Sequence, residues 1–308
     1  MINYLENNKI FKLILGAGNS NYEEITKLIT LYSSVGCRFF DIEASIEALK
    51  AYKEGIKDCK NDCFVCISVG ANQDPHLTKC KIDIEKCVNC KKCENICLQN
   101  ALNNCLIDEK KCIGCKKCKN ICPNSAIIEY QKIKEWEEFL PELFDKVDCI
   151  EFHMISNNIE EIDKKWDYLC SNFKGVLSIC TDRSKLSDED LVKQLKKMIK
   201  IANRKIIIQA DGNPMTGGKD DYLTTFQALA TADIINKNNI NCYLIMSGGT
   251  NSKTSELASL IGVKNNGVAI GSFARKIVKE YTSHPDFLLN KEIFNQGAKI
   301  AKSLINKI

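Results

Sequence analysis

Two closely spaced cysteine runs are the residues of this chain best suited to chemistry. The first comprises Cys87, Cys90, Cys93 and Cys97, and the second comprises Cys112, Cys115, Cys118 and Cys122. In each run two residues separate the first three cysteines, and the fourth follows after three more. Thiolates at this spacing hold [4Fe–4S] clusters. The runs therefore predict redox chemistry or redox sensing.

The two runs predict crossed ligand sets, as in bacterial-type ferredoxins, where the fourth cysteine of each run binds the cluster of the other. Cluster 1 is assigned to Cys87, Cys90, Cys93 and Cys122, and cluster 2 to Cys97, Cys112, Cys115 and Cys118. Zinc is the alternative, but structural zinc sites usually draw their ligands from two separated pairs. Pro123 follows the second run, and Leu98 occupies the equivalent position after the first run. This difference removes no ligand.

The runs lie in an internal repeat, because Cys87 and Cys112 are 25 positions apart (112 − 87) and their flanking residues match. Cys80 and Cys105 occupy equivalent positions in this repeat. We expect both to pack beside the clusters as small apolar groups, with an oxidisable thiol pair as the alternative. Lysines outnumber acidic residues in this repeat. Their positive charge favours the reduced, more negative form of a cluster and would attract an acidic electron donor. The alternative is that these lysines only form a hydrated surface.

Outside the repeat, short apolar runs alternate with amphipathic ones. The predicted strands are Lys12–Gly16, Arg38–Glu43, Phe64–Val69, Cys149–Ile155, Gly175–Thr181, Lys205–Ala210, Cys242–Ser247 and Gly267–Gly271. The clearest predicted helices are Tyr22–Ser33, Ile46–Lys57, Asp188–Ala202, Asp221–Asn236, Thr254–Ile261 and Phe273–Tyr281. This alternation predicts an α/β fold of the (β/α)8 TIM-barrel type, with an open doubly wound sheet as the competing architecture.

The cysteine repeat falls between the third and fourth predicted strands. We therefore predict a first barrel part over residues 1–78, a 2[4Fe–4S] ferredoxin-like insert over 79–130 and a second barrel part over 131–308. Trp136–Phe144 is the expected helix after the insert. In a barrel, the insert would occupy a strand-to-helix loop on the face where active sites are built.

Polar residues at the carboxyl ends of the predicted strands form a candidate pocket. They are His76, Glu151, His153, Gln209 and Asp211. Period-two alternation places Glu151 and His153 on one face of their strand. Asp41 and Glu43 share a face in the same way. No catalytic role is assigned, and a hydrogen-bonded structural histidine is the alternative for each histidine.

Glycine-rich turns follow the last two predicted strands and form a candidate anion site. Its residues are Gly248, Gly249, Thr250, Asn251, Gly271 and Ser272. Small residues expose backbone N–H groups, and a helix N-terminus follows each turn. In TIM barrels these loops commonly grip phosphate. We expect a phosphate, a flavin phosphate or another anion, with turns required only for packing as the alternative.

Composition narrows the class of protein. The 308 residues are 44% apolar and 27% charged, and the net charge of +4 with no basic, aromatic-interleaved stretch argues against nucleic acid binding. No apolar run is long enough for a membrane span, and the N-terminus lacks a secretory pattern. The 18 cysteines, without such a signal and at metal-ligand spacing, predict a reducing, cytoplasmic location. The oligomeric state is left open.

Motifs along nearly the whole chain resemble the family of the light-dependent period protein, LdpA. They include Asp74-Pro75-His76, the cysteine runs, Glu151-Phe152-His153, residues 209–217, Gly248–Asn251 and Gly271–Arg275. The resemblance implies an iron–sulfur protein that relays light-dependent redox state to the cyanobacterial circadian clock and associates with clock input proteins. The regular spacing of the first run departs from that family's looser, proline-rich group.

The main functional hypothesis is a non-enzymatic redox sensor with electron-donor or signalling proteins as partners. Reduction adds negative charge to a cluster. This charge would shift the conformation of the insert, which would act as a lid on the barrel, or its contacts with a partner. The alternative is a TIM-barrel oxidoreductase that binds FMN or a phosphorylated substrate and receives electrons from the two clusters. A pure electron carrier would leave the barrel without a purpose.

Overall fold

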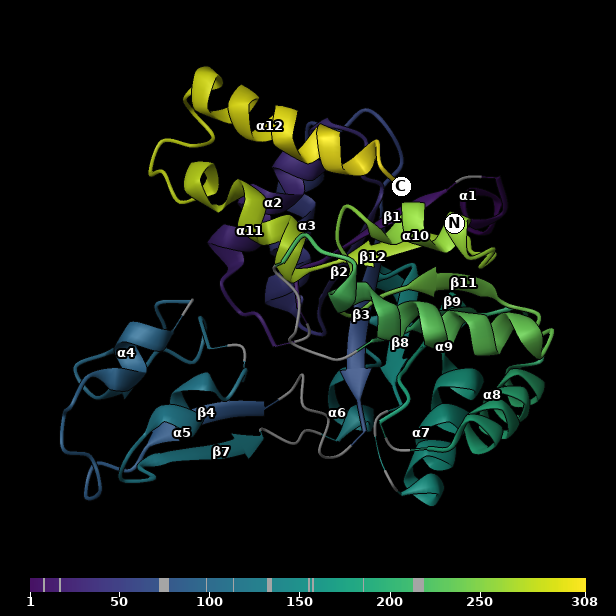
Figure 1. Ribbon diagram of the computed structural model, residues 1–308. Coiled ribbons are helices and arrows are strands. Elements are labelled where there is room, and N and C mark those ends of the chain that lie inside the picture. Colours follow the sequence, from purple (N-terminus) through teal and green to yellow (C-terminus); the bar gives the residue numbers. More distant parts are fainter. Residues whose placement is uncertain are drawn as a thin grey trace.

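The computed structural model describes residues 1–7, 9–16, 18–71, 78–97, 99–112, 114–131, 135–154, 156, 158–184, 186–212 and 219–308. Its largest part is a closed barrel of parallel strands (Figure 1) in the order β1-β12-β11-β10-β9-β8-β3-β2. These strands are β1 (Ile10–Ile14), β2 (Phe39–Glu43), β3 (Phe64–Gly70), β8 (Cys149–His153), β9 (Val176–Thr181), β10 (Ile207–Ala210), β11 (Tyr243–Met246) and β12 (Gly267–Ile270). The predicted (β/α)8 barrel is confirmed, and the open-sheet alternative is wrong.

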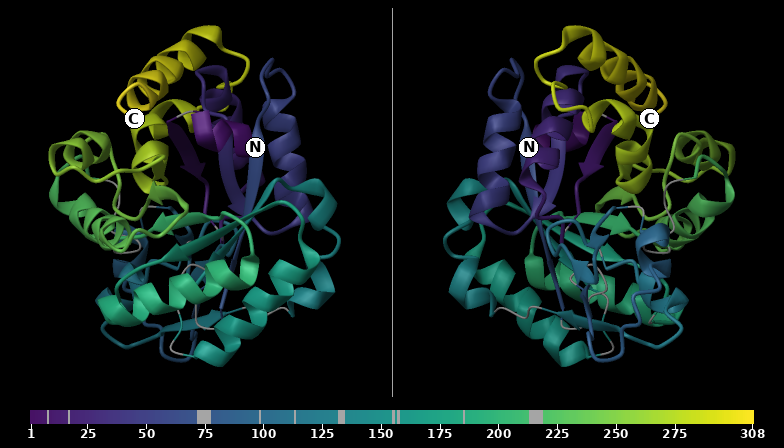
Figure 2. Two further views of the ribbon diagram at one scale, coloured as in Figure 1. Left: turned by 90° about the vertical axis from the view of Figure 1, so that its right-hand side faces the viewer. Right: turned by 90° about the vertical axis from the view of Figure 1, so that its left-hand side faces the viewer.

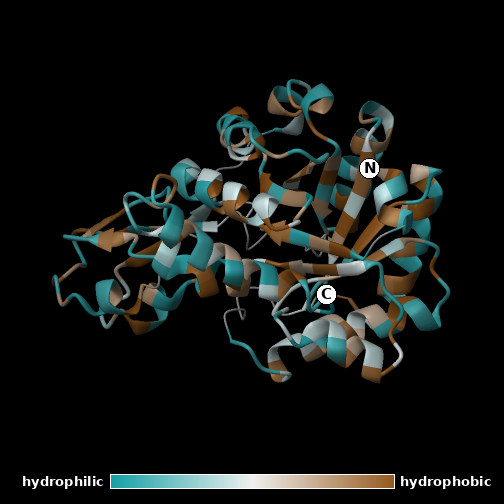
Figure 3. Ribbon diagram, turned by 90° about the horizontal axis from the view of Figure 1, so that it is seen from above, coloured by the Kyte–Doolittle hydropathy of each residue, from teal (hydrophilic) through white to brown (hydrophobic). Residues whose placement is uncertain are grey.

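The strands are buried on both faces because their residues alternate between two apolar environments. Outward-facing residues such as Leu13, Phe40 and Phe152 pack against the surrounding helices. Inward-facing residues at the amino-terminal end of the barrel, among them Ile10 and Phe39, form a separate apolar layer. Figure 3 shows apolar colouring concentrated on the strands, as expected for parallel strands covered by helices.

Helices ring the barrel, as the two side views in Figure 2 show. They are α2 (Tyr22–Ser34), α3 (Ile46–Ile56), α7 (Ile159–Asn172), α8 (Asp188–Ala202), α9 (Phe226–Lys237), α10 (Thr254–Leu260), α11 (Ser272–Thr282) and α12 (Lys291–Ile305). At the N-termini of α3 and α8, the side chains of Ser45 and Ser187 accept backbone N–H bonds. A short helix, α1 (Ile2–Asn7), places Leu5 against the apolar layer inside the barrel.

Two predicted helices differ from those observed. The segment expected to be helical over 136–144 forms only α6 (Trp136–Phe139) and a 3₁₀ turn, η2 (Phe144–Lys146). Pro141 explains the break, because it lacks the N–H donor that the helix needs at this position. The helix predicted from residue 221 instead begins with a 3₁₀ turn, η3 (Leu223–Thr225), before α9.

The segment between β3 and β8 forms a small unit beside the barrel (Figure 1). It contains an antiparallel pair, β4 (Thr78–Ile82) with β7 (Ile127–Gln131), and two short helices, α4 (Lys92–Ile96) and α5 (Lys117–Ile121). A second small pair joins β5 (Leu102–Asn103) to β6 (Leu106–Ile107). We call residues 78–131 the insert. It leaves the barrel after the carboxyl end of β3, and therefore at the barrel mouth, the face where the barrel strands end.

Candidate iron–sulfur sites and the polar interior of the barrel

The eight cysteines of the two runs gather in two hollows of the insert. The first, of about 430 Å³, is lined by Cys87, Cys90, Cys93, Cys105 and Cys122. The second, of about 350 Å³, is lined by Cys80, Cys97, Cys112, Cys115 and Cys118. The structure thus brings together three cysteines of one run and the fourth of the other in each hollow. The additional cysteines of the repeat, Cys80 and Cys105, lie one in each hollow.

The backbone repeats with the same 25-residue period as the sequence. Lys91 and Lys116, which precede α4 and α5, have φ angles of 58° and 61°. Asn89 and Gly114 also share a positive φ. Lysine rarely adopts this left-handed conformation, which carries a strain energy. Its presence in both copies indicates that the chain needs these turns to wrap three thiols around one hollow.

Backbone amides point at the sulfurs of the fourth cysteines. Ala101 N donates to Cys97 Sγ and Ala126 N donates to Cys122 Sγ, both at 3.3 Å. Hydrogen bonds to sulfur stabilise negative charge on a ligand and tune the potential of a bound cluster. The four run cysteines of each hollow, with a backbone amide donating to one of them, are a donor set that fits an iron–sulfur cubane.

Cys80 prepares two of these sulfurs for metal binding. The Cys80 thiol has one proton, which it can donate to the sulfur of either Cys112 or Cys118; this lowers the pKa of Cys112 to about 5 and that of Cys118 to about 7. The same bonds raise the pKa of Cys80, so Cys80 keeps its proton. Because the thiolate is the form that binds metal, Cys112 and Cys118 are predisposed to act as ligands at neutral pH.

One lysine connects the second hollow to the barrel. Lys79, on β4, donates from Nζ to the carbonyl oxygens of Cys112, at 2.7 Å, and Glu109, at 2.8 Å. It also donates to the carbonyl oxygen of Gly18, in the loop that follows β1. A single ammonium group therefore bridges the backbone of a cysteine in the second hollow and a loop at the barrel mouth.

A layer of polar residues crosses the barrel interior above the apolar one. We call it the polar layer, and it comprises Lys12, Asp41, Ser68, Glu151, Ser178 and Gln209. Lys12 Nζ, on β1, lies 2.7 Å from Asp41 Oδ2 on β2 and 2.7 Å from Glu151 Oε2 on β8. Burial opposes the charge on Lys12, but these carboxylates raise its pKa well above the usual range. Lys12 is therefore a buried cation.

Glu151 is the most heavily hydrogen-bonded member of the polar layer. Besides Lys12, it accepts from Ser178 Oγ at Oε2 and from Gln209 Nε2 at Oε1, both at 2.8 Å. Burial alone would raise its pKa, but Lys12 and His153 hold the pKa of Glu151 well below its usual range. Burial raises the pKa of Asp41, although Lys12 opposes this shift. Glu151 is therefore the more firmly ionised carboxylate.

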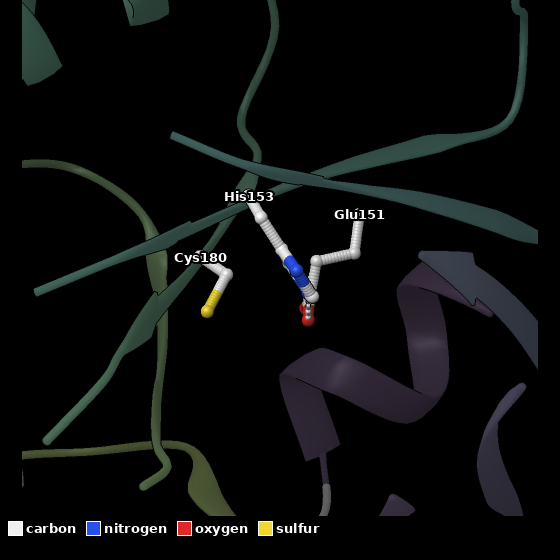
Figure 4. A group of neighbouring side chains, drawn as sticks. All are labelled: Glu151, His153 and Cys180. Carbon is white, nitrogen blue, oxygen red and sulfur yellow. Dashed lines mark ion pairs between the residues drawn. The ribbon is translucent and has the colours of Figure 1, made fainter. Parts of the chain in front are cut away.

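His153 and Cys180 lie next to Glu151, toward the barrel mouth (Figure 4). His153 Nε2 is 3.5 Å from Glu151 Oε1, and His153 pairs with Cys180 in the β8–β9 register. Gln209 Nε2 is 3.6 Å from Cys180 Sγ. The negative charge of Asp211 contributes to the raised pKa of Cys180, after burial. The structure therefore brings four predicted pocket residues together, while the fifth, His76, lies outside the described residues.

Sequence reasoning missed three members of the polar layer, namely Lys12, Ser68 and Ser178. Lys12 had a recognisable signal, because it is the charged residue inside the otherwise apolar strand segment Ile10–Ile14. A buried charge needs a partner, and the inward-facing acids Asp41 and Glu151 are its partners. The serines gave no comparable signal, since serine is common in strands and turns alike.

The candidate anion residues lie at the ends of β11 and β12. Gly248 and Gly249 have φ angles of 70° and 74°, and Gly271 and Ser272 begin α11. Thr250 Oγ1 donates to the carbonyl oxygen of Ala269. Asn251 Nδ2 donates to the carbonyl oxygens of Lys219 and Asp221 and to Thr224 Oγ1. These two side chains hold the loop in place, so an anion here would contact mainly backbone N–H groups. The anion site stays a prediction.

These observations define a class of protein, a (β/α)8 barrel that carries a ferredoxin-type insert. The sequence model described as "4Fe-4S binding domain" matches residues 106–128, and the model described as "Light dependent period A C-terminal domain" matches residues 143–307. Because the second match spans more than half of the chain, the chain belongs to the LdpA family. It is an iron–sulfur protein of that family.

Solved structures support the barrel. The YdjI aldolase from Escherichia coli K12 is 7% identical, with a TM-score of 0.50 over 99% of this chain and 95% of its own. A putative fructose-1,6-biphosphate aldolase from Coccidioides immitis is 10% identical, with a TM-score of 0.52 over 98% and 92%. At such identities the likeness shows the fold alone. No curated protein matches the sequence. No helix in the described part of the chain is long and apolar enough to cross a membrane.

Proposed function

We propose that this protein is a redox-responsive iron–sulfur protein with two [4Fe–4S] clusters. The observation that carries the proposal is the crossed lining of the two hollows, each with three cysteines of one run and the fourth of the other. When bound, the clusters would supply reversible one-electron storage. The residues that hold them are those of the predicted ligand sets, Cys87, Cys90, Cys93 and Cys122 for cluster 1 and Cys97, Cys112, Cys115 and Cys118 for cluster 2.

One residue of the chain, Lys79, connects the insert to the barrel. Lys79 contacts the backbone of Cys112 and that of Gly18. A change of charge in the second hollow would alter the electrostatic energy of this ammonium group and so the balance between arrangements of the barrel mouth. The family name supports the further proposal that the resulting signal concerns light-dependent redox state and reaches circadian clock input proteins.

An electron donor would meet a partly apolar surface with charges of both signs at the first hollow. Ile84 and Val88 are 60% and 62% exposed. Lys86, Lys91 and Lys92 are exposed around them. Asp83, Glu85 and Glu94 offset these lysines locally, but over the whole insert ten lysines stand against six acids, and this excess of positive charge would steer an acidic protein toward the clusters. We therefore propose acidic electron-donor or signalling proteins as partners, in a reducing, cytoplasmic compartment.

Anaerobic purification followed by iron and acid-labile sulfide analysis tests the proposal. We expect an iron-to-protein ratio of about eight, because each cubane holds four irons. Dithionite reduction should give electron paramagnetic resonance signals of reduced [4Fe–4S] clusters. The control is Cys242→Ser, which changes a half-buried barrel cysteine outside both hollows. Protein that carries zinc in place of iron, or that behaves identically when oxidised and reduced, would contradict the proposal.

The polar layer favours a second candidate function, an oxidoreductase in which the barrel binds FMN or a phosphorylated substrate. Its carboxylates, lysine and glutamine converge near the barrel mouth, where barrel active sites are built. Mass spectrometry of small molecules released from the anaerobically purified protein distinguishes the two functions. A stoichiometric flavin would favour the enzyme, and its absence together with intact clusters would favour the sensor.

A further inference from the structure

We propose that Glu151, His153 and Cys180 form a binding site for one divalent metal ion of the Zn²⁺ type inside the barrel. The site is separate from the cysteines of the insert. It draws its ligands from two neighbouring barrel strands, β8 and β9. This inference does not depend on the presence of iron–sulfur clusters.

Strand geometry places the three side chains around one point. Glu151 and His153 are two positions apart on β8, so both face the barrel interior. Cys180 is the β9 partner of His153. One possible ligand atom from each residue lies within 4.8 Å of the other two, and all three residues are buried. Figure 4 shows the three side chains projecting to the same side of the two strands.

The distance between two of the proposed ligand atoms fits a coordinated ion. His153 Nε2 and Glu151 Oε1 are 3.5 Å apart. Zinc–nitrogen and zinc–oxygen bonds of about 2.1 Å at tetrahedral angles place two ligands about 3.4 Å apart. The two atoms therefore hold a ligand–ligand distance suited to zinc without a movement of the backbone. Small rotations of the Cys180 side chain can complete the set.

The ligand chemistry selects the class of metal. Imidazole nitrogen, thiolate sulfur and carboxylate oxygen together suit Zn²⁺, whereas Mg²⁺ and Ca²⁺ prefer oxygen ligands alone. Three protein ligands leave one position open, which is the pattern of catalytic rather than structural zinc sites. The side chain of His153, 7% exposed, is the most exposed of the three in the described structure.

The surrounding polar layer orients Glu151 as a ligand. Lys12 and Ser178 bind its Oε2 atom, and Gln209 binds Oε1. Oε1 accepts from Gln209 and also contacts His153 Nε2, so a metal would take the place of the Nε2–Oε1 contact, with Nε2 unprotonated, while Gln209 keeps its hydrogen bond to Oε1 and gives up its longer, 3.6 Å contact with Cys180 Sγ. Such outer partners hold metal ligands in place in known sites. They explain why the carboxylate is fixed beside His153.

Charges balance around an ion at this position. Lys12 is paired with Asp41, and a divalent ion would be neutralised by the Glu151 carboxylate and the Cys180 thiolate. A second group of possible ligands, Asp41, Cys66 and Glu151, is less suitable. Lys12 Nζ already lies 2.7 Å from both of its carboxylates and occupies the place of a cation. The His153 side of Glu151 is therefore the more suitable side for a metal.

Zinc-edge X-ray absorption of the cluster-containing protein with one equivalent of Zn²⁺ tests the site, because this edge does not report iron. We expect one sulfur and otherwise nitrogen or oxygen neighbours. Cys180→Ser should remove the sulfur contribution, and His153→Ala should weaken zinc binding by more than about tenfold. Cys170→Ser, a half-buried cysteine on α7, is the matched control and should change neither result.

Three outcomes would overturn the metal site. They are zinc surrounded by four sulfurs, which places it on the insert cysteines, no zinc binding by protein with intact clusters, and unchanged zinc binding in both variants. The wild-type spectrum decides the first two even if a variant fails to fold. Iron content and cluster signals are measured on the same samples, so a failure of the zinc site is distinguishable from a failure of the proposed redox function.

Discussion

Lys12 Nζ lies 2.7 Å from Glu151 Oε2 inside the barrel, and neither side chain is exposed. The two residues are 139 positions apart and come from strands that are not neighbours in the sheet, β1 and β8. Taking two charges out of water costs several kcal/mol per ion, which only good geometry and further hydrogen bonds offset. Asp41, Ser178 and Gln209 supply these bonds, so the ion pair depends on the whole polar layer.

Lys12→Met should destabilise the barrel strongly. The substitution leaves two buried carboxylates without their cation, which costs about 3–5 kcal/mol when one partner of a buried pair is removed. Chemical denaturation followed by the fluorescence of Trp136 and Trp166, both buried, measures the loss. Lys237→Met, which removes an exposed i,i+4 ion pair with Asp233, is the control and should leave the midpoint unchanged. Equal stability of the two variants would contradict a buried charge at Lys12.

Stability should fall as the pH rises above about 9, near the unfolded pKa of cysteine. Burial raises the pKa values of the Cys37 and Cys66 thiols, so these thiols stay protonated when folded but ionise when unfolded. Their contribution to the free energy of unfolding is complete below the thiol pKa of the unfolded state. It is lost as the pH rises toward the higher thiol pKa of the folded state. Denaturation between about pH 8 and pH 10.5 measures the slope.

Cys37→Ala isolates one thiol in this alkaline range. Cys37 Sγ donates to the carbonyl oxygens of Phe11 and Phe39, as a protonated thiol does. Removing one group that ionises only in the unfolded state should reduce the slope by about 1.4 kcal/mol per pH unit. Cys59→Ala, at a half-buried position, is the comparison variant. An unchanged slope in Cys37→Ala would show that the buried thiol is not responsible.

The barrel and the gathering of the cysteines were predictable because both depend on short-range patterns. Strand–helix alternation is visible in any window that contains a β/α unit, and the eight cysteines lie in two short runs whose spacing is that of ferredoxins. The ion pairs of Lys12 could not be read in the same way, since its partners are set by the strand order of the closed barrel. The contacts of Cys80 with Cys112 and Cys118 likewise depend on the pairing of β4 with β7, which no sequence signal indicated.

Lys79→Met should uncouple the insert from the barrel mouth. Lys79 loses its bonds to the carbonyl oxygens of Gly18, Glu109 and Cys112, and hydrogen bonds from a charged group contribute about 1.5–3 kcal/mol each. Hydrogen–deuterium exchange of residues 18–21 should differ between oxidised and reduced wild-type protein, and this difference should vanish in the variant. Lys81→Met, an exposed residue on the same strand, is the control. Redox-dependent exchange that survives in Lys79→Met would contradict this route.

Cys122→Ser should make the thiols of the first run, Cys87, Cys90 and Cys93, accessible to reagents, and not those of its own run. Cys122 shares the first hollow with Cys87, Cys90 and Cys93, so loss of its ligand weakens the cluster held there. Alkylation of the folded, anaerobic variant followed by peptide mass spectrometry should label those three cysteines and leave the second hollow protected. Cys97→Ser should give the reverse pattern because Cys97 lines the second hollow. If Cys122→Ser instead exposed the other cysteines of its own run, the ligand sets would be uncrossed.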